Sequence, residues 1–222
     1  MNYSAEFKKY ALSEGISSLT LDYHGKQIES SMTPMILEER EMRVTQMTVF
    51  DRLMMDRILW VAGPVNDRMS TIVQAQLMFL DSVEKKDITM HIDSPGGSVK
   101  SGLSMVDVME YIRSDIQTVN TGMAASMGSV LLGAGTKGKR SSLRFSKVML
   151  HQSSGGFGGN IQDAEIDFKE WREVNQILFD LLGEYCGKTA EQVKNDATRD
   201  FWLSSQEAVE YGIIDEVIKT KK

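Results

Sequence analysis

The sequence predicts an α/β fold in which a mainly parallel β-sheet is covered by helices. From Arg57 onward, short β-branched or apolar runs alternate with longer segments of helical periodicity. Strands that alternate with helices in this way are typical of parallel sheets with crossover helices. The chain has neither an internal repeat nor a low-complexity linker, so we expect one main domain.

Each element has its own signal. Strands are expected over residues 57–62 (RILWVA), 88–92 (ITMHI), 116–120 (IQTVN) and 148–151 (VMLH), with helices between them over 66–80, 98–112 and 126 to about 132. In the second helix, apolar residues recur every three or four positions at Val99, Leu103, Val106 and Met109 or Ile112. We expect this face to pack on the sheet.

The C-terminal third is predicted to be mainly helical. After the glycine-rich interval SSGGFGGN, apolar residues recur with helical spacing over residues 161–182, which indicates one long helix. Thr189 with Gln192, and Ser204 with Glu207, match the capping box and mark two further helix starts. An apolar strand, FWL, is expected between these two helices.

Composition restricts the class of protein. The 222 residues are 41% hydrophobic and 25% charged, which is typical of globular proteins and excludes a disordered or collagen-like chain. A net charge of −6 gives no general attraction to nucleic acid or to an anionic membrane. The sequence lacks a membrane-length apolar run and the pattern of an export signal, and its single Cys186 cannot form an internal disulfide. We expect a cytoplasmic protein that binds neither nucleic acid nor membrane.

The N-terminal part carries weaker patterns. Residues 1–31 are polar with scattered apolar positions, and we interpret them as a leader or propeptide. The next segment begins near Pro34 and combines adjacent charges with many methionines. Its apolar positions follow neither the helical nor the strand period for long, so periodicity assigns it no element.

Candidate general bases are few, because the chain has only three histidines. His24 lies in the polar leader, and His91 lies within a predicted strand, where a structural role is favoured. His151 ends an apolar strand, at the sheet edge where α/β folds place their sites. A structural role for an isolated histidine there is the alternative.

A serine and a pair of glycines follow two other strands. The segment GMAASMGS (residues 122–129) opens a helix, and the free N–H groups at the start of that helix would stabilise an oxyanion beside Ser126. This arrangement resembles that of a nucleophile elbow, although the G-x-S-x-G spacing is absent. The alternative is that the Ser126 hydroxyl only caps the helix. In DSPGGS (93–98), Gly96 and Gly97 can turn backbone N–H groups outward, although an ordinary glycine turn is also possible. With parallel strands, both turns and His151 reach the same sheet edge.

Four segments in this order, DSPGGSV, GMAASMGSVLLGAGTKGKR, VMLHQ and TRDFWLSSQEAVEYGIID, resemble the proteolytic subunit of the Clp protease, ClpP, and the likeness runs from about residue 32 to 217. The resemblance implies a crotonase-like α/β fold, a spiral of β-β-α units with a protruding handle helix. It further implies a leader or propeptide (1–31), an axial hairpin region (32–55) and one catalytic domain (56–222) that includes the handle (152–185).

The same resemblance implies a serine endopeptidase that works through an acyl-enzyme and needs no metal or organic cofactor. It assigns Ser126 as nucleophile, His151 as base, Asp200 as orienting carboxylate, and the N–H groups of Gly97 and Met127 as oxyanion donors. The residues alone do not select Asp200 among the aspartates, and Asp196 is its near competitor.

The family also implies an assembly and a partner. Two stacked seven-membered rings, a tetradecamer, would enclose the active sites, so that unfolded polypeptides must be delivered by an AAA+ unfoldase that uses the ATP. Met78 and Tyr111 match part of the groove on which this ATPase docks. Two alternatives are a crotonase-type acyl-CoA enzyme and an inactive structural member of a ring, although a dead subunit would be expected to lack a triad residue.

Some positions depart from the family pattern. Asp93 replaces the usual Asn, Ser153 replaces the Pro after the HQ pair, and His91 replaces an aromatic of the docking groove. Phe201 and Trp202 stand where a basic residue followed by an aromatic is commoner. The run GAGTKGK (133–139) imitates a phosphate loop, but it is expected to follow a helix and lead toward a strand, so we interpret it as a helix end with a basic surface turn.

Overall fold

The computed structural model describes residues 35–40, 43–154 and 160–219, and the chain divides into two compact units, Met1–Arg52 and Leu53–Lys222. In the first unit, β1 (Met35–Arg40) pairs antiparallel with β2 (Arg43–Thr48). The helix α3 (Val49–Met55) follows β2 and includes the boundary between the two units. Periodicity predicted neither strand, whereas the resemblance implied a hairpin in this segment. Its axial position in a ring stays a prediction, and the expected leader, with His24, lies outside the described residues.

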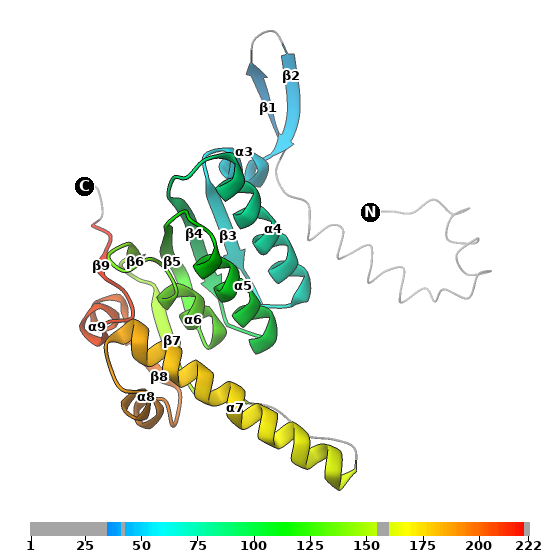
Figure 1. Cartoon of the computed structure of the whole chain (residues 1–222). Helices are drawn as coiled ribbons and strands as arrows, with labels where there is room; N and C mark the ends of the chain where they lie inside the picture. Colours follow the sequence, from blue (N-terminus) through cyan, green and yellow to red (C-terminus); the bar gives the residue numbers. More distant parts are fainter. Residues whose placement is uncertain (1–34, 41–42, 155–159, 220–222) are drawn as a thin grey trace, which may run out of the picture. The chain divides into compact units, whose positions relative to one another are not determined.

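A seven-stranded sheet organises the second unit (Figure 1). The strands β3, β4, β5, β6 and β9 are neighbours in this order and run parallel. β7 pairs parallel with the end of β5 and antiparallel with β8. Their bounds are β3 Ile58–Ala62, β4 Ile88–Ser94, β5 Ile116–Ala125, β6 Arg140–Ser142, β7 Lys147–Leu150, β8 Phe201–Ser204 and β9 Glu216–Val217. The mainly parallel sheet is therefore confirmed, while β6 and β9 are short strands that periodicity did not identify.

The helices follow the predicted order. Beside the sheet, α5 packs against both α4 and α6. Both predicted capping boxes are formed, at the starts of α8 and α9. The bounds are α4 Asp67–Val83, α5 Val99–Tyr111, α6 Met127–Gly133, α7 Ile161–Cys186, α8 Ala190–Asp196 and α9 Ser205–Tyr211. On α5, Val106 and Met109 are buried in the core, and Val99 and Leu103 pack against it partly buried, as the apolar spacing predicted for that face. Met105, which that spacing did not include, is buried as well.

The long helix α7 is only partly covered by the rest of its unit. Its buried residues, Leu178, Phe179, Leu182 and Gly183, all lie in its C-terminal half, where it contacts α6 and α8. Its N-terminal half extends away from the sheet (Figure 1), and Ile161, Ile166 and Phe168 are exposed there. α7 therefore has the form that the resemblance implies for a handle.

The strand β5 is longer than predicted. It continues past Asn120 to Ala125, because Met123–Ala125 pair with β7 after the first half of the strand has paired with β4 and β6. The small residues of the GMAAS segment are thus mostly strand, and the turn into α6 is confined to Ser126.

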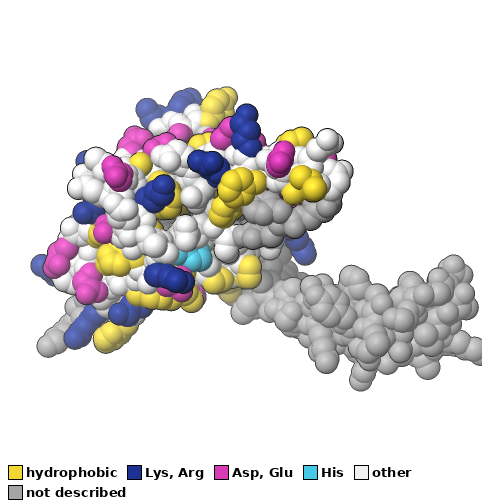
Figure 2. All heavy atoms as spheres, turned by 90° about the horizontal axis from the view of Figure 1, so that it is seen from below, with side chains coloured by type: hydrophobic (Ala, Val, Ile, Leu, Met, Phe, Trp, Pro, Cys, Tyr) yellow, Lys and Arg dark blue, Asp and Glu magenta, His cyan; other side chains and the backbone are white. Residues whose placement is uncertain are grey.

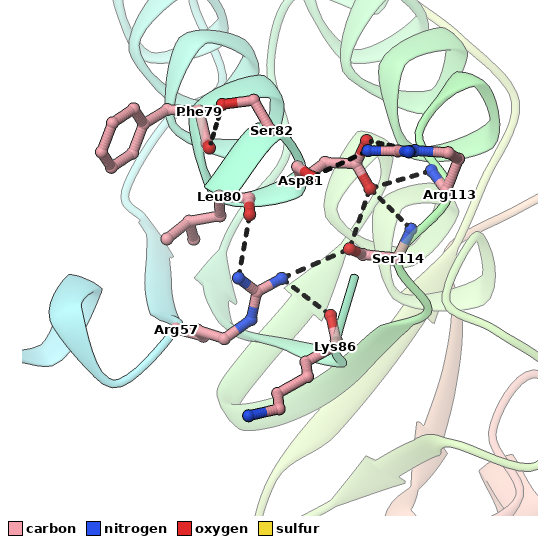
Figure 3. A network of polar contacts seen from close by, with 8 residues as sticks. All are labelled: Arg57, Phe79, Leu80, Asp81, Ser82, Lys86, Arg113 and Ser114. Atoms are coloured by element: carbon pink, nitrogen blue, oxygen red, sulfur yellow. Dashed lines mark hydrogen bonds and ion pairs between the residues drawn. The ribbon is translucent and has the colours of Figure 1, made fainter. Parts of the chain in front are cut away.

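A network around Arg57 joins the loops at the amino ends of the strands (Figure 3). Its guanidinium donates hydrogen bonds to the carbonyls of Leu80 (2.9 Å), Lys86 (2.7 Å) and Asp87 (3.1 Å), and to Ser114 Oγ (3.3 Å). Arg57 was predicted to begin the strand, but its φ of 63° is left-handed and β3 starts at Ile58. The arginine thus donates to carbonyls of α4 and of the loop that follows it, and the Leu80 carbonyl accepts the N–H of Glu84 as well.

The run that imitates a phosphate loop leads into a strand, not into the helix that such a loop requires. Lys139 bridges Asp87 (2.6 Å) and Asp115 (2.8 Å) at the surface. Arg140, the residue directly after this run, is buried and paired with Asp215 at 2.7 Å. Burial alone would raise the pKa of Asp215, but its hydrogen bonds with Arg140 hold that pKa below its usual value.

His91 is half-buried on β4 and stacks on Trp60 of β3, with ring centroids 4.7 Å apart. Its Nδ1 is buried and has no hydrogen-bond partner among the described residues. Burial therefore lowers the pKa of His91. The structural role favoured by the sequence agrees with this placement.

We expect this histidine to make stability fall as the pH is lowered from 7.5 to 5.5. The unfolded chain protonates His91 near pH 6.5, whereas the folded chain resists protonation, so in this window the unfolded state binds more protons and stability rises with pH. His91→Phe keeps a ring against Trp60 but cannot titrate. Urea unfolding followed by circular dichroism should show a weaker pH dependence for this variant, and identical pH dependence in both proteins would contradict the role of His91.

Candidate active site

Ser126 is the single residue between β5 and α6, and its backbone is strained. Its φ of 53° and ψ of −123° lie in a region that residues other than glycine rarely adopt. Hydrogen bonds hold this conformation from both sides, because its N–H donates to the carbonyl of Met149 (2.9 Å) and its carbonyl accepts the N–H of Ser129 (2.9 Å). The side chain of Ser126 forms no capping hydrogen bond, so the helix-cap alternative is wrong.

The glycine turn after β4 lies directly against this serine. Gly96 has a φ of +91°, and a Cβ added to it would come within 2.6 Å of Ser126 Cβ and 2.9 Å of Met127 N. Gly97 has a φ of +148°, and a Cβ there would collide with the carbonyl oxygen of Val65. Glycine at position 96 therefore permits the close approach of the two turns, and glycine at position 97 permits the close approach of Val65. The convergence predicted for the two turns is present.

Two backbone N–H groups at this junction are free to bind a ligand. The first N–H of α6, from Met127, has no partner within its helix, and neither it nor the N–H of Gly97 donates a hydrogen bond to any described residue. Gly97 is held by a bridge to Val65 that uses the carbonyl of Gly96 and the N–H of Ser98, which leaves its own N–H unused.

His151 directly follows β7, and Asp200 comes from the loop between α8 and β8. His151 Nδ1 lies 3.2 Å from Asp200 Oδ1, and the side chains are 25% and 63% exposed, respectively. The competitor Asp196 instead accepts a hydrogen bond from the hydroxyl of Tyr211 (3.0 Å). The fold thus brings Asp200, and not Asp196, to the imidazole.

Ser126 and His151 line one small cavity of about 20 Å³, which has room for about one water molecule. Val99, Val130, Leu178, Phe179 and Leu182 form its apolar lining. Among the described residues, no hydrogen bond reaches Ser126 Oγ, so the structure joins His151 to Asp200 but leaves the serine hydroxyl beside them unpaired. An open cleft of about 610 Å³ adjoins this site, lined by His151, Gln152, Ser153, Ser154, Trp171, Thr198, Arg199 and Asp200.

Two further contacts shape the site without a clear sequence signal. Asp93 Oδ1 accepts the N–H of Met123 (3.0 Å), a bond that the oxygen of an asparagine would also accept. Ser153 bonds to Asn175, which lies half-buried in α7. Asn175 lies inside a predicted helix, and no local pattern marks it as part of a site.

One face of the described residues carries side chains of both charges (Figure 2). Figure 2 shows basic and acidic side chains interspersed with hydrophobic ones on one face, where a histidine side chain reaches the surface. Among the described residues, no helix combines the length and low charge of a membrane-spanning segment.

The sequence is similar to those of known proteins over nearly its whole length. The model of the Clp protease family matches residues 39–221. The chain is 46% identical over 219 residues to the ATP-dependent Clp protease proteolytic subunit of Porphyromonas gingivalis, with 98% of this chain and 99% of the relative covered. It is 47% identical over 218 residues to the subunit of the same name from Bacteroides fragilis, covering 97% and 99%.

The family match and the mainly parallel sheet agree with the ClpP/crotonase-like fold that the resemblance implied. Because the family model covers most of the chain and the relatives align from end to end, the chain belongs to the Clp protease family of serine endopeptidases.

Proposed function

We propose that this chain cleaves unfolded polypeptides with a catalytic triad of Ser126, His151 and Asp200, as a subunit of a barrel that an AAA+ unfoldase feeds. The observation that carries the proposal is the strained backbone of Ser126. This serine lies against the glycine turn at Gly96 and lines a cavity with His151, whose imidazole contacts the Asp200 carboxylate. Strain of this kind is retained where function requires it.

The geometry supports specific roles for the two ring nitrogens of His151. Asp200 faces Nδ1, so a proton on Nδ1 is stabilised and Nε2 is left to take the proton of Ser126 Oγ. Ser126 then attacks the peptide carbonyl, the amine leaves with the proton from His151, and water hydrolyses the acyl-enzyme. The step requires Ser126 and His151, which share a cavity wall, to approach to hydrogen-bonding distance.

The N–H groups of Gly97 and Met127 are the proposed oxyanion donors. Each such donor stabilises the transition state by roughly 3 kcal/mol. Their support is that both are free of partners among the described residues and that Gly96 packs against Ser126 and Met127. The mechanism needs no metal or organic cofactor on this chain.

Members of this family assemble into oligomers and work with Clp ATPases. For this chain we propose two stacked heptameric rings in the cytoplasm, with α7 as the handle between them. The exposed Ile161, Ile166 and Phe168 support this role, because apolar side chains on a projecting helix are buried only by a neighbour. Met78 and Tyr111, which are also exposed, are proposed to contact the ATPase.

Labelling with a fluorophosphonate tests the assignment. We expect the probe to attach to Ser126, because only an activated serine reacts with it, and peptide mapping by mass spectrometry should locate the adduct. A chain that uses the same fold as an acyl-CoA enzyme would stabilise an enolate with its N–H groups and would not react. Labelling elsewhere, or none, would contradict the proposal.

A further inference from the structure

The chain that follows His151 is attached to α7 by one side chain. The N–H of Ser153 donates to Asn175 Oδ1 at 3.1 Å, and Ser153 Oγ donates to the same atom at 2.8 Å. Because a backbone N–H can only donate, the atom that faces Ser153 has to be the amide oxygen, which fixes the orientation of the Asn175 amide.

This attachment lies at the proposed catalytic site. Ser153 and Asn175 line the same cavity as Ser126 and His151. One residue earlier, the N–H of Gln152 donates to the carbonyl of Ala197 at the end of α8 (3.1 Å). The two residues after His151 are therefore held on two sides, by the end of α8 and by α7.

We infer that Asn175 is a positioning residue for the imidazole of His151, acting through its two hydrogen bonds to Ser153. The inference rests on the proposed role of His151 as general base. Neither Asn175 nor Ser153 touches the reacting atoms in this role.

The physical argument is geometric. The rotamers open to a side chain depend on its backbone dihedrals, and a general base has to lie about 2.6–3.2 Å from the proton it takes. His151 is held at Nδ1 by Asp200, whose side chain is mostly exposed, so this contact alone restrains the ring weakly. The attachment of Ser153 to α7 adds a restraint on the backbone of the same segment.

Replacement of Asn175 by leucine tests the inference, since leucine has a similar volume but no acceptor. We expect kcat for a short fluorogenic peptide to fall about 10- to 100-fold with KM little changed, because a misplacement of about 1 Å costs rate and not ground-state binding. Ser153→Ala, which loses one of the two bonds and keeps the N–H, should show a smaller fall in kcat.

Asn175→Asp provides a readout that a purely structural role would not move. Aspartate keeps the acceptor for Ser153, so most of kcat should be retained at alkaline pH. Its carboxylate would lie in the cavity that His151 lines, and a negative charge there favours the imidazolium over the neutral imidazole. We therefore expect the acid limb of kcat/KM to move to higher pH.

Gln176→Leu is the matched control, because Gln176 is the next residue on α7 and is exposed, and its side chain bonds only to Asp180 among the described residues. It should keep wild-type kcat and pH profile. Thermal melting and mass photometry will show whether each variant folds and assembles, and Ser153→Ala carries the test if Asn175→Leu does not fold.

Unchanged kcat in the folded Asn175→Leu or Ser153→Ala variant, or an unmoved acid limb in Asn175→Asp, would overturn the positioning role. Fluorophosphonate labelling of Ser126 in the wild-type chain separates this outcome from failure of the proposed function. If Ser126 is labelled normally and the Asn175 variants give these contrary results, only the positioning role of Asn175 is contradicted. If Ser126 is not labelled, the proposed triad itself is contradicted.

Discussion

Replacement of Ser126 by alanine is expected to reduce kcat for short fluorogenic peptides by about 10⁶-fold, to below detection. The loss is this large because the acyl-enzyme cannot form without the hydroxyl, and the remaining groups act as a unit with it. Short peptides are the right substrate because they need no unfolding before cleavage. Initial rates measured on purified particles, with and without the substitution, give the result directly.

The same substitution should leave the fold and assembly unchanged. Ser126 Oγ makes no hydrogen bond to the described residues, and the backbone bonds of Ser126 to Met149 and Ser129 do not depend on its side chain. The strained φ of 53° remains strained for alanine, so no stabilisation through relief of strain is expected. Mass photometry should report the same particle mass as wild type. Full peptidase activity in an assembled Ser126→Ala particle would contradict the assignment of the nucleophile.

Replacement of Asp200 by asparagine is expected to lower kcat by about 10²- to 10⁴-fold. An amide can present N–H to Nδ1 and so stabilise the wrong tautomer of His151, and it no longer stabilises the imidazolium. A fall in kcat of about 10⁴-fold is typical when the orienting carboxylate is buried. Asp200 is 63% exposed, so water compensates for part of the lost charge and the smaller losses within this range are expected.

Asp196→Asn is the matched control for this measurement. Asp196 lies one helical turn earlier and meets Tyr211 instead of His151, and an asparagine oxygen would still accept the Tyr211 hydroxyl. We expect unchanged kcat for this variant. If Asp196→Asn lost the activity and Asp200→Asn retained it, the contact at 3.2 Å between His151 and Asp200 would have no catalytic meaning.

Much of the fold was predictable because its signals are local. The apolar spacing of α5, the two capping boxes and the apolar run of β4 each depend on residues within a few positions of one another. Periodicity missed the hairpin β1–β2. Apolar and polar residues alternate clearly in a strand when one of its faces covers a core, and the adjacent charges of this segment obscure that alternation. β6 and β9, of three and two residues, are too short for any period.

The candidate site was predictable only in part. The glycine turn and Ser126 could be placed at one sheet edge because parallel strands present their carboxyl ends together. The choice of Asp200 over Asp196 came from the family resemblance and not from the residues themselves. Asn175 carried no signal at all, because its contact with Ser153 joins positions that are 22 residues apart.

The sequence alone determined most of the strands and helices of the second unit and the residue types at their ends, because local propensity, capping and apolar spacing act within single segments. Tertiary structure decided the φ of Ser126, the extension of β5 to Ala125, and which carboxylate meets His151. Each of these depends on pairing between distant segments: β5 is extended by β7, and the loop after α8 carries Asp200 to the sheet edge. Such pairings arise only when the whole sheet forms, because the energy that selects them comes from contacts between segments and not from within any single segment.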